Sequence, residues 1–270
     1  MTSSTFVAAS GDNYELQMGR WSRRLAEPFL DFCGYSDGEA VLDAGCGTGS
    51  LTFALARRAK DVRIQAIDFA PTYVEHAAQH NHDPNIAFRV GDICALPFAD
   101  ASFDRVLSLL VLHFVPDTDR AVSEMRRVAR PGATVAAAVW DARGGYMAAR
   151  MFVDAAATLD QKGNEMRARS LTRPMTRPGE LVAAWRKAGF VDIRETMLAI
   201  RMEYASFDDY WTPYLGKDGP GGQYVTGLSP AERDRLRDLV RGAYVDGEPD
   251  GPRSYAAIAW AVAGTVPVGR

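Results

Sequence analysis

The sequence is poor in the features that hold secreted and membrane proteins in place. It has three cysteines, Cys33, Cys46 and Cys94, an odd number with no Cys-x-x-Cys spacing, which argues against a disulfide framework. Residues 1–6 show no basic cluster ahead of a long apolar run, so no signal peptide is expected. The most apolar late stretch, residues 256–268, is too short to cross a bilayer. These absences favour a soluble protein of the reducing cytoplasm, without a membrane partner.

An excess of positive charge is also missing. The 31 lysines and arginines are outnumbered by 34 aspartates and glutamates, and the formal net charge is −3. Proteins that hold nucleic-acid phosphates need a basic face, so no nucleic-acid partner is expected. The chain has four histidines, of which His76, His80 and His82 are close in sequence, but no neighbouring carboxylate or cysteine completes a ligand set. We therefore expect no metal site.

A hydrophobic content of 47% and an alternation of strand and helix patterns over residues 40–140 predict an α/β fold with a largely parallel sheet. Proline and glycine at 131 and 132 are expected to end the helix over 117–130 before the fifth strand starts at residue 134. A capping box beginning at Ser229 predicts a further helix. Seven strands are expected, over residues 41–43, 62–67, 86–90, 103–109, 134–140, 190–204 and 254–263.

The patterns divide the chain into four parts. An amphipathic helical segment over residues 1–36 precedes a core at 37–140 that would bind a cofactor. Residues 141–176 show no strand pattern and are interpreted as an inserted helical cap over the sheet. Residues 177–270 complete the sheet and carry a second helical insertion at 205–253.

The most informative motif is VLDAGCGTGS at residues 41–50. An apolar run ends in Asp43, and glycines follow at 45, 47 and 49, as in a buried strand that turns tightly into a helix. A loop that binds pyrophosphate offers bare backbone N–H groups, and a carboxylate at its base disfavours that ligand and favours a cation. The dinucleotide pattern G-x-G-x-x-G would need glycine where Ser50 stands, which weakens a nicotinamide interpretation without excluding it.

This segment resembles motif I of the class I S-adenosylmethionine-dependent methyltransferases, of the type-11 or UbiE-like small-molecule kind, whose usual form is close to V-L-D-x-G-C-G-T-G. The resemblance is strong over residues 38–140, weaker over 177–204 and slight elsewhere. It implies a Rossmann-like sheet with helices on both faces, S-adenosyl-L-methionine as methyl donor and S-adenosyl-L-homocysteine as product. The donor's sulfonium and ammonium groups agree with an acid at position 43.

The ends of the first three strands supply matching partners for such a donor. Ligands of open parallel sheets lie outside the carboxyl ends of the strands. There Asp68 could accept both ribose hydroxyls, and Asp92 could accept the adenine amine while Ile93 covers the ring. The resemblance adds Phe69 against the adenosine and a backbone contact at Leu109. The residues predicted to bind the cofactor in the glycine turn are Asp43, Gly45, Cys46 and Gly47.

Two predictions lie outside the strand tips. In the N-terminal segment, Tyr14 could meet the donor's carboxylate and Trp21 its sulfonium by a cation–π contact. Alternatively, Trp21, Leu25 and Phe29 form the apolar face of a helix that packs on the sheet. His113, beyond the fourth strand, is the candidate catalytic base, or it only orders its loop.

The absence of two motifs narrows the class of methyl acceptor. The chain lacks the N/D-P-P-Y/F segment of nucleobase amino-methyltransferases after the fourth strand and the Pro-Cys nucleophile of cytosine-C5 enzymes. A small-molecule acceptor with an apolar part is expected, bound by a monomer or homodimer. Two alternatives stay open: a nicotinamide-dependent oxidoreductase, although no Tyr-x-x-x-Lys pair is present, and a non-catalytic S-adenosylmethionine-binding protein. Candidate pocket walls are Trp140, Tyr146, Met147, Met151, Phe152, Trp211, Tyr214 and Tyr224.

Overall fold

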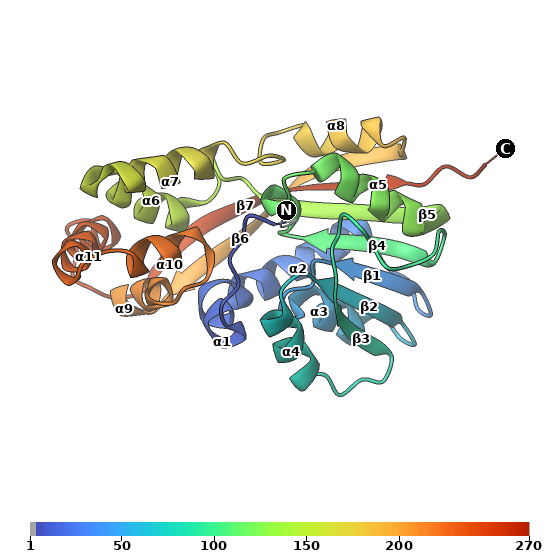
Figure 1. The fold of residues 1–270 in the computed structure, drawn as a ribbon, viewed down its shortest axis with the longest axis horizontal. Coiled ribbons are helices and arrows are strands. Elements are labelled where there is room, and N and C mark those ends of the chain that lie inside the picture. Colours follow the sequence, from blue (N-terminus) through green and yellow to red (C-terminus); the bar gives the residue numbers. More distant parts are fainter. Residues whose placement is uncertain (1–3, 270) are drawn as a thin grey trace.

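The computed structural model describes residues 4–269 and has a single seven-stranded sheet at its centre (Figure 1). The strand order is β3-β2-β1-β4-β5-β7-β6, and β7 runs antiparallel to both of its neighbours. The other pairings are parallel, so the predicted mostly parallel, seven-stranded sheet is confirmed. The strands are β1 (Ala40–Ala44), β2 (Arg63–Asp68), β3 (Ile86–Val90), β4 (Phe103–Leu109), β5 (Ala129–Trp140), β6 (Val191–Tyr204) and β7 (Arg253–Thr265).

Helices cover both faces of the sheet. On one face lie α2 (Arg20–Cys33) and α3 (Ser50–Arg58), and on the other α5 (Thr118–Val128) and α8 (Glu180–Lys187) (Figure 1). Helix α4 (Pro71–Gln79) packs on β2 and β3. Strand β1 is buried on both faces, since Val41 packs with α2 and α3 while Leu42 packs with α5. This explains why its sequence is continuously apolar up to Asp43.

A helical lobe lies at one end of the sheet, around the long extensions of β6 and β7 (left in Figure 1). The predicted capping box is present, because the side chain and backbone N–H of Ser229 both bond with Glu232 at the start of α11. Aromatic side chains fill the lobe, among them Tyr204, Phe207, Tyr210 and Tyr244. Its helices are α6 (Met147–Leu159), α7 (Gln161–Leu171), α9 (Phe207–Trp211), α10 (Gly219–Thr226) and α11 (Pro230–Val245).

One boundary prediction is wrong. Pro131 and Gly132 do not separate α5 from β5, because β5 already begins at Ala129. The pairing of β4 with β5 shifts register there, from Phe103 opposite Ala129 to Arg105 opposite Thr134. Gly132 has a φ of +82°, so the pair forms a bulge inside the strand and not a break before it.

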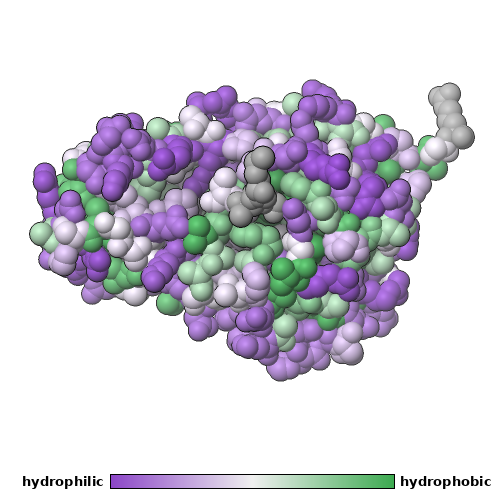
Figure 2. All heavy atoms as spheres, viewed as in Figure 1, coloured by the Kyte–Doolittle hydropathy of each residue, from purple (hydrophilic) through white to green (hydrophobic). Residues whose placement is uncertain are grey.

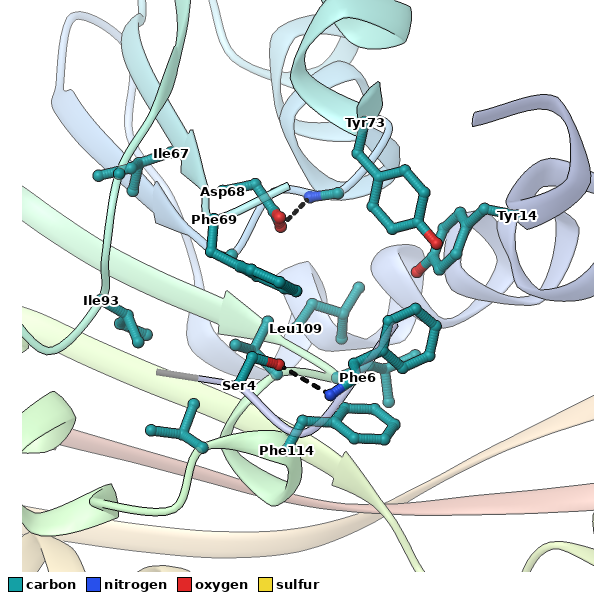
Figure 3. Close-up of a pocket in the computed structure, with 16 residues that line it drawn as sticks. Ser4, Phe6, Tyr14, Ile67, Asp68, Phe69, Tyr73, Ile93, Leu109 and Phe114 are labelled. Carbon is teal, nitrogen blue, oxygen red and sulfur yellow. Dashed lines mark hydrogen bonds between the residues drawn. The ribbon is translucent and has the colours of Figure 1, made fainter. Parts of the chain in front are cut away.

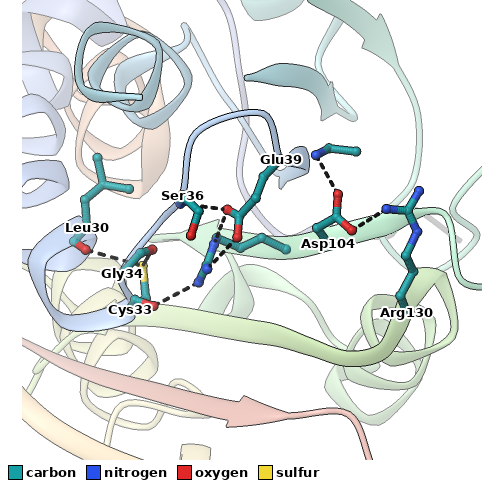
Figure 4. Close-up of polar contacts among 9 residues, drawn as sticks. Leu30, Cys33, Gly34, Ser36, Glu39, Asp104 and Arg130 are labelled. Carbon is teal, nitrogen blue, oxygen red and sulfur yellow. Dashed lines mark hydrogen bonds and ion pairs between the residues drawn. The ribbon is translucent and has the colours of Figure 1, made fainter. Parts of the chain in front are cut away.

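A partly buried ion pair lies at the amino-terminal ends of the central strands β1 and β4. Arg105 donates to Glu39 at 2.8 and 2.9 Å and to the carbonyl of Cys33, the last residue of α2, at 2.9 Å. Figure 4 shows Glu39 beside the end of α2, and Asp104 bonded to Arg130 further along. This cluster connects α2 to the amino-terminal ends of β1 and β4. The glycine turn lies at the opposite, carboxyl end of β1.

The surface seen in Figure 2 is largely hydrophilic, with hydrophobic residues gathered near the middle of the view. Among the helices of residues 4–269, none combines the length and apolar character needed to cross a membrane.

Candidate functional site

A cavity with about 630 Å³ of empty space, part of it open solvent, lies at the carboxyl ends of β1, β2 and β4 (Figure 3). The strand order changes direction at β1. Strands β2 and β3 follow one another on one side of β1, and β4 and β5 follow one another on the other side. Crevices at such a switch point are where open α/β sheets bind ligands. The position of the cavity is therefore set by the strand order.

The glycine turn forms one wall of this cavity. Gly45 has a φ of +89°, and a Cβ there would lie 2.2 Å from the Val111 side chain. Any other residue would force the tips of β1 and β4 apart. Gly47 also lines the cavity, and a Cβ on it would stand 3.7 Å from the hydroxyl of Tyr14. Cys46 is buried and does not line the cavity.

Asp68 joins the glycine turn to the start of α4. One carboxylate oxygen accepts from the backbone N–H of Gly47 and the other from that of Ala70, both at 2.9 Å (Figure 3 shows the first). Burial raises the pKa of Asp68, while these N–H donors oppose the rise. A carboxylate has about four acceptor positions, so Asp68, which lines the cavity, keeps acceptor capacity beyond these bonds.

Asp43 lies beneath the turn and does not line the cavity. Thr52 of α3 donates to one of its oxygens at 2.6 Å, and the other oxygen has no hydrogen-bond partner in the described chain. Burial raises the pKa of Asp43 to about 7, and the negative charge of Asp68 adds to the rise. The sequence predicted that Asp43 contacts the ligand directly. The structure places its carboxyl behind the glycine turn and outside the lining of the cavity.

The remaining strand tips give an apolar slot. Ile93, Phe69 and Leu109 line the cavity, together with Ile67 and Val111. Asp92 does not line it, because its carboxylate turns back to accept from the backbone N–H of Cys94 at 2.7 Å. The structure therefore brings Ile93 to the predicted place and leaves Asp92 as the cap of a turn.

Four aromatic rings close the cavity on the side away from the sheet: Phe6, Tyr14, Tyr73 and Phe114 (Figure 3). Phe6 and Phe114 meet edge to face at 4.9 Å between centroids, and Tyr14 lies 4.7 Å from Tyr73. Tyr14 is at the end of α1 (Gly11–Tyr14), where the chain enters a π-helical turn at Glu15–Gly19. Such turns often occur at functional sites.

Phe6 reaches the cavity because residues 4–10, here called the N-terminal strap, run across its opening. The backbone N–H of Thr5 donates to the carbonyl of Phe114 at 2.9 Å, and that of Gly219 to the carbonyl of Val7 at 3.0 Å. Asp218 is fully buried and accepts from the backbone of Ala9, from Asn13 and from the Tyr73 hydroxyl, each at 2.7 Å. One carboxylate thus binds the strap, α1, α4 and the helical lobe together.

Trp21 is not part of the site. It is 2% exposed, lies on neither cavity, packs edge-on against Tyr204 at 5.2 Å and is covered by the Arg20 guanidinium at 4.3 Å. Leu25 and Phe29 are buried on the same face of α2. The predicted contact with a sulfonium is therefore wrong, and the packing alternative describes this helix.

A second cavity, with about 1160 Å³ of empty space that includes open solvent, lies between the sheet and the helical lobe. It shares Phe6, Tyr14, Leu110 and Phe114 with the first, so the two adjoin. Leu110 has a φ of +65°, a conformation that costs a branched side chain energy and recurs at functional sites. Of the predicted walls, Trp140, Tyr146, Phe152 and Tyr214 line this cavity, whereas Met147, Met151, Trp211 and Tyr224 do not.

His113 lines the second cavity from the short helix Leu112–Phe114. It is 3% exposed, and its Nδ1 has no hydrogen-bond partner within residues 4–269. Burial and the positive charge of Arg173 hold the pKa of His113 well below its usual value. The imidazole is therefore neutral at physiological pH, with one ring nitrogen able to accept a proton.

Several residues of the site escaped sequence reasoning. Phe6 and Arg173 come from the N-terminal strap and from the loop after α7, and nothing in their local sequence marks them. Phe114 stands next to His113 and could have been inferred from that neighbour. No three histidine, cysteine, aspartate or glutamate side chains come together as metal ligands in the part of the chain that the structure describes.

Comparisons with known proteins agree with this geometry. Residues 42–137 match the family described as "Methyltransferase domain". The chain is 37% identical over 119 residues to malonyl-acyl-carrier-protein O-methyltransferase of Erwinia pyrifoliae and 39% identical over 123 residues to demethylmenaquinone methyltransferase of Beutenbergia cavernae. These alignments cover 44% and 46% of this chain, and 44% and 48% of those proteins. The chain thus spans less than half the length of the curated relatives it matches.

The fold is also found among solved structures. Phosphoethanolamine N-methyltransferase 2 of Haemonchus contortus, solved with phosphomonomethylethanolamine and S-adenosylhomocysteine, superposes with a TM-score of 0.60 at 17% identity. The match covers 96% of this chain and 57% of that one. At this identity the similarity establishes the fold alone.

Proposed function

We propose that this chain moves a methyl group from S-adenosyl-L-methionine to a small-molecule acceptor, and the match of residues 42–137 to the family described as "Methyltransferase domain" supports this proposal. The observation that carries the proposal is the pair of adjoining cavities, which share Phe6, Tyr14, Leu110 and Phe114. One cavity has the polar and apolar groups that the donor needs. The other is large, aromatic and next to it.

The first cavity fits the donor at both of its ends. Asp68 has free acceptor positions for two ribose hydroxyls, and Ile93, Phe69 and Leu109 offer apolar surface to an adenine ring. Asp43 has an unpartnered oxygen behind the glycine turn, and a ligand with cationic groups would favour the ionised form of this carboxyl. When bound, S-adenosylmethionine supplies a methyl group on a sulfonium that is a good leaving group.

The protein's own contribution is alignment and the exclusion of water. Phe6, Tyr14 and Phe114 enclose the boundary between the cavities, where the acceptor atom and the methyl group would meet. Neutral His113 is positioned to take a proton from an acceptor hydroxyl or amine that must lose one. This gives His113 the role of general base for such acceptors.

The two alternatives are less well supported. A nicotinamide dinucleotide would bring its pyrophosphate to a turn whose Gly47 N–H already donates to Asp68, with Asp43 behind it. A non-catalytic binding protein would need only the first cavity, whereas the second lies beside it and is lined by side chains from the sheet and the helical lobe. Release of S-adenosylhomocysteine in the presence of acceptors would separate turnover from binding.

The acceptor and the setting of the enzyme follow from the same features. The aromatic lining of the second cavity supports an acceptor with an apolar part, and neither a nucleic acid nor a membrane is proposed as partner. Cys33, Cys46 and Cys94 are free thiols, which agrees with the proposed cytoplasmic location. A monomer or homodimer would suffice, since the lining residues of both cavities come from one chain.

Calorimetry with S-adenosylhomocysteine and with NAD tests the proposal. We expect binding of S-adenosylhomocysteine and none of NAD, and tight NAD binding alone would refute the methyltransferase assignment. Asp68→Ala should weaken the binding of S-adenosylhomocysteine by about 1–3 kcal/mol, because a charged acceptor of two hydroxyls is lost. The matched control is Asp238→Ala, which removes an exposed carboxylate of α11 and should leave the affinity unchanged.

A further inference from the structure

The charges on the second cavity are all of one sign. Three arginines line it, Arg20, Arg150 and Arg173, and no aspartate or glutamate of residues 4–269 does. Arg20 is paired with Asp209 at 2.9 Å and Arg150 with Asp154 at 3.0 Å, both outside the lining. The guanidinium of Arg173 makes no hydrogen bond or ion pair with any residue that the structure describes. A permanently charged group thus faces the cavity without a counterion.

The surroundings of Arg173 make this arrangement costly. Its guanidinium lies over the ring of Phe114, 4.6 Å from the centroid, and next to the uncharged groups of His113 and Tyr146. Burial lowers the pKa of Arg173 to about 10, so the side chain remains charged at neutral pH. Arg173 is partly buried, and a partly buried cation without an anionic partner is unfavourable, because a cation–π contact offsets only part of the cost of lost solvation. An anion that entered the cavity and paired with Arg173 would remove the remainder of this free-energy cost.

The remainder of the cavity is suited to a flat apolar body. The rings of Phe152 and Tyr214 are stacked at 3.9 Å with an angle of 2° between their planes. Trp140 is 4% exposed, and its indole N–H is buried without an acceptor in the described chain. The cavity therefore offers aromatic faces and unused donors, and lacks carboxylates.

We propose that the acceptor of this enzyme is an aromatic or similarly flat molecule with one negative charge, such as a carboxylate, which pairs with Arg173. The proposal rests on the methyltransferase function proposed above and adds the class of its acceptor. One charge is inferred because Arg20 pairs with Asp209 and Arg150 with Asp154, which Arg167 shares, so that Arg173 is the lining arginine without an acid partner in the described residues. Arg173 can bind a carboxylate through two parallel N–H donors, which gives it the role of a specificity residue.

Three probes with the same naphthyl ring and different charge test this inference: 2-naphthoate and 2-naphthamide, which are nearly equal in shape, and the bulkier 2-naphthyl phosphate. Each is titrated into the full chain saturated with S-adenosylhomocysteine, by calorimetry at pH 7.5. We expect 2-naphthoate to bind at least tenfold more tightly than the neutral amide. Equal affinities for acid and amide, or no binding of the acid at millimolar concentration, would overturn the proposal, and this comparison needs no variant.

Variants then assign the selectivity to one side chain. Arg173→Gln should abolish the preference for 2-naphthoate over the amide, and Arg173→Lys should retain part of it, because lysine keeps the charge and loses the planar fork. The matched control is Arg169→Gln, which removes an exposed arginine of α7 and should keep the full preference. A preference that survives in Arg173→Gln, or a tenfold tighter binding of the phosphate in the unaltered protein, would contradict the assignment.

The proposed function and this inference can fail separately. S-adenosylhomocysteine binding is measured first in the unaltered protein, and its absence would refute the donor site. Acid-selective binding of 2-naphthoate would still stand in that case, since it depends on the second cavity. Normal S-adenosylhomocysteine binding without acid selectivity would instead refute only the acceptor class.

Discussion

Replacing Asp43 by asparagine is expected to stabilise the fold at pH 8 and to have the opposite effect, or none, at pH 4. The carboxyl is buried, accepts one hydrogen bond from Thr52 and has one unpartnered oxygen. Its pKa is raised from 3.8 to about 7 because burial disfavours the charged form. At about 1.4 kcal/mol per pKa unit, keeping Asp43 ionised in the folded protein costs about 4 kcal/mol at high pH.

The sign of the pH dependence follows from proton binding. Between pH 3.8 and about 7 the folded protein holds a proton on Asp43 that the unfolded chain has lost, so the free energy of unfolding falls as pH rises through this interval. Asparagine does not titrate and escapes that loss. Its amide leaves buried donors unpaired at a cost of about 1–3 kcal/mol, so a net gain of about 1–3 kcal/mol remains at pH 8.

Urea unfolding of both proteins at pH 4, 5, 6, 7 and 8 measures this directly. The difference between variant and unaltered protein isolates Asp43, because groups that do not interact with it cancel. Thr52→Val serves as a control, since it removes the hydrogen bond that favours the ionised form and should extend the fall in stability to higher pH. A difference between Asp43→Asn and the unaltered protein that stays constant from pH 4 to 8 would refute the reasoning.

Three further predictions concern the N-terminal strap, the ion pair of Arg105 with Glu39 and the candidate base His113. Asp218→Ala removes the acceptor that binds Ala9, Asn13 and Tyr73, so amide exchange of residues 4–14 should accelerate and S-adenosylhomocysteine binding weaken about tenfold; unchanged exchange would contradict a clamping role. Arg105→Met leaves the partly buried Glu39 without its partner and should lower the free energy of unfolding by about 1–3 kcal/mol in urea melts, with a second change, Glu39→Gln, restoring part of the loss; no loss on the single change would count against the pair. Because the pKa of His113 is well below its usual value, kcat should be flat from pH 6 to 8 for a hydroxyl acceptor and fall sharply in His113→Gln, whereas an acidic limb near pH 6.5 would exclude this buried imidazole as the base.

Predictions about the fold succeeded wherever the pattern was local and failed where pairing decided the outcome. The bounds predicted for the third and fourth strands, residues 86–90 and 103–109, are those of β3 and β4. Their apolar runs are bounded by turn residues, which is a signal that the chain carries by itself. Pro131 and Gly132 were misassigned because a bulge depends on the register between two strands, and the sequence of one strand does not contain that register.

The site shows the same division. The glycine turn and Asp68 were recognised from the sequence, since a strand tip, a tight turn and a helix start follow one another within a few residues. Asp43 and Asp92 were expected to face the ligand as Asp68 does. The structure turns them to Thr52 and to the backbone of Cys94, because a side chain's direction depends on the partners that packing brings near.

By itself, then, the sequence determined the class of the sheet, the place of the glycine turn and the chemistry of one cavity. Only the tertiary structure decided what closes that cavity and what lies beside it. Three residues that are far apart in the chain line the same cavity: Phe6, His113 and Arg173. They come together because the strap, the end of β4 and the loop after α7 converge at the carboxyl ends of the strands. Contacts between distant segments depend on how the whole chain packs. A local sequence pattern therefore could not predict an unpaired arginine in an aromatic cavity.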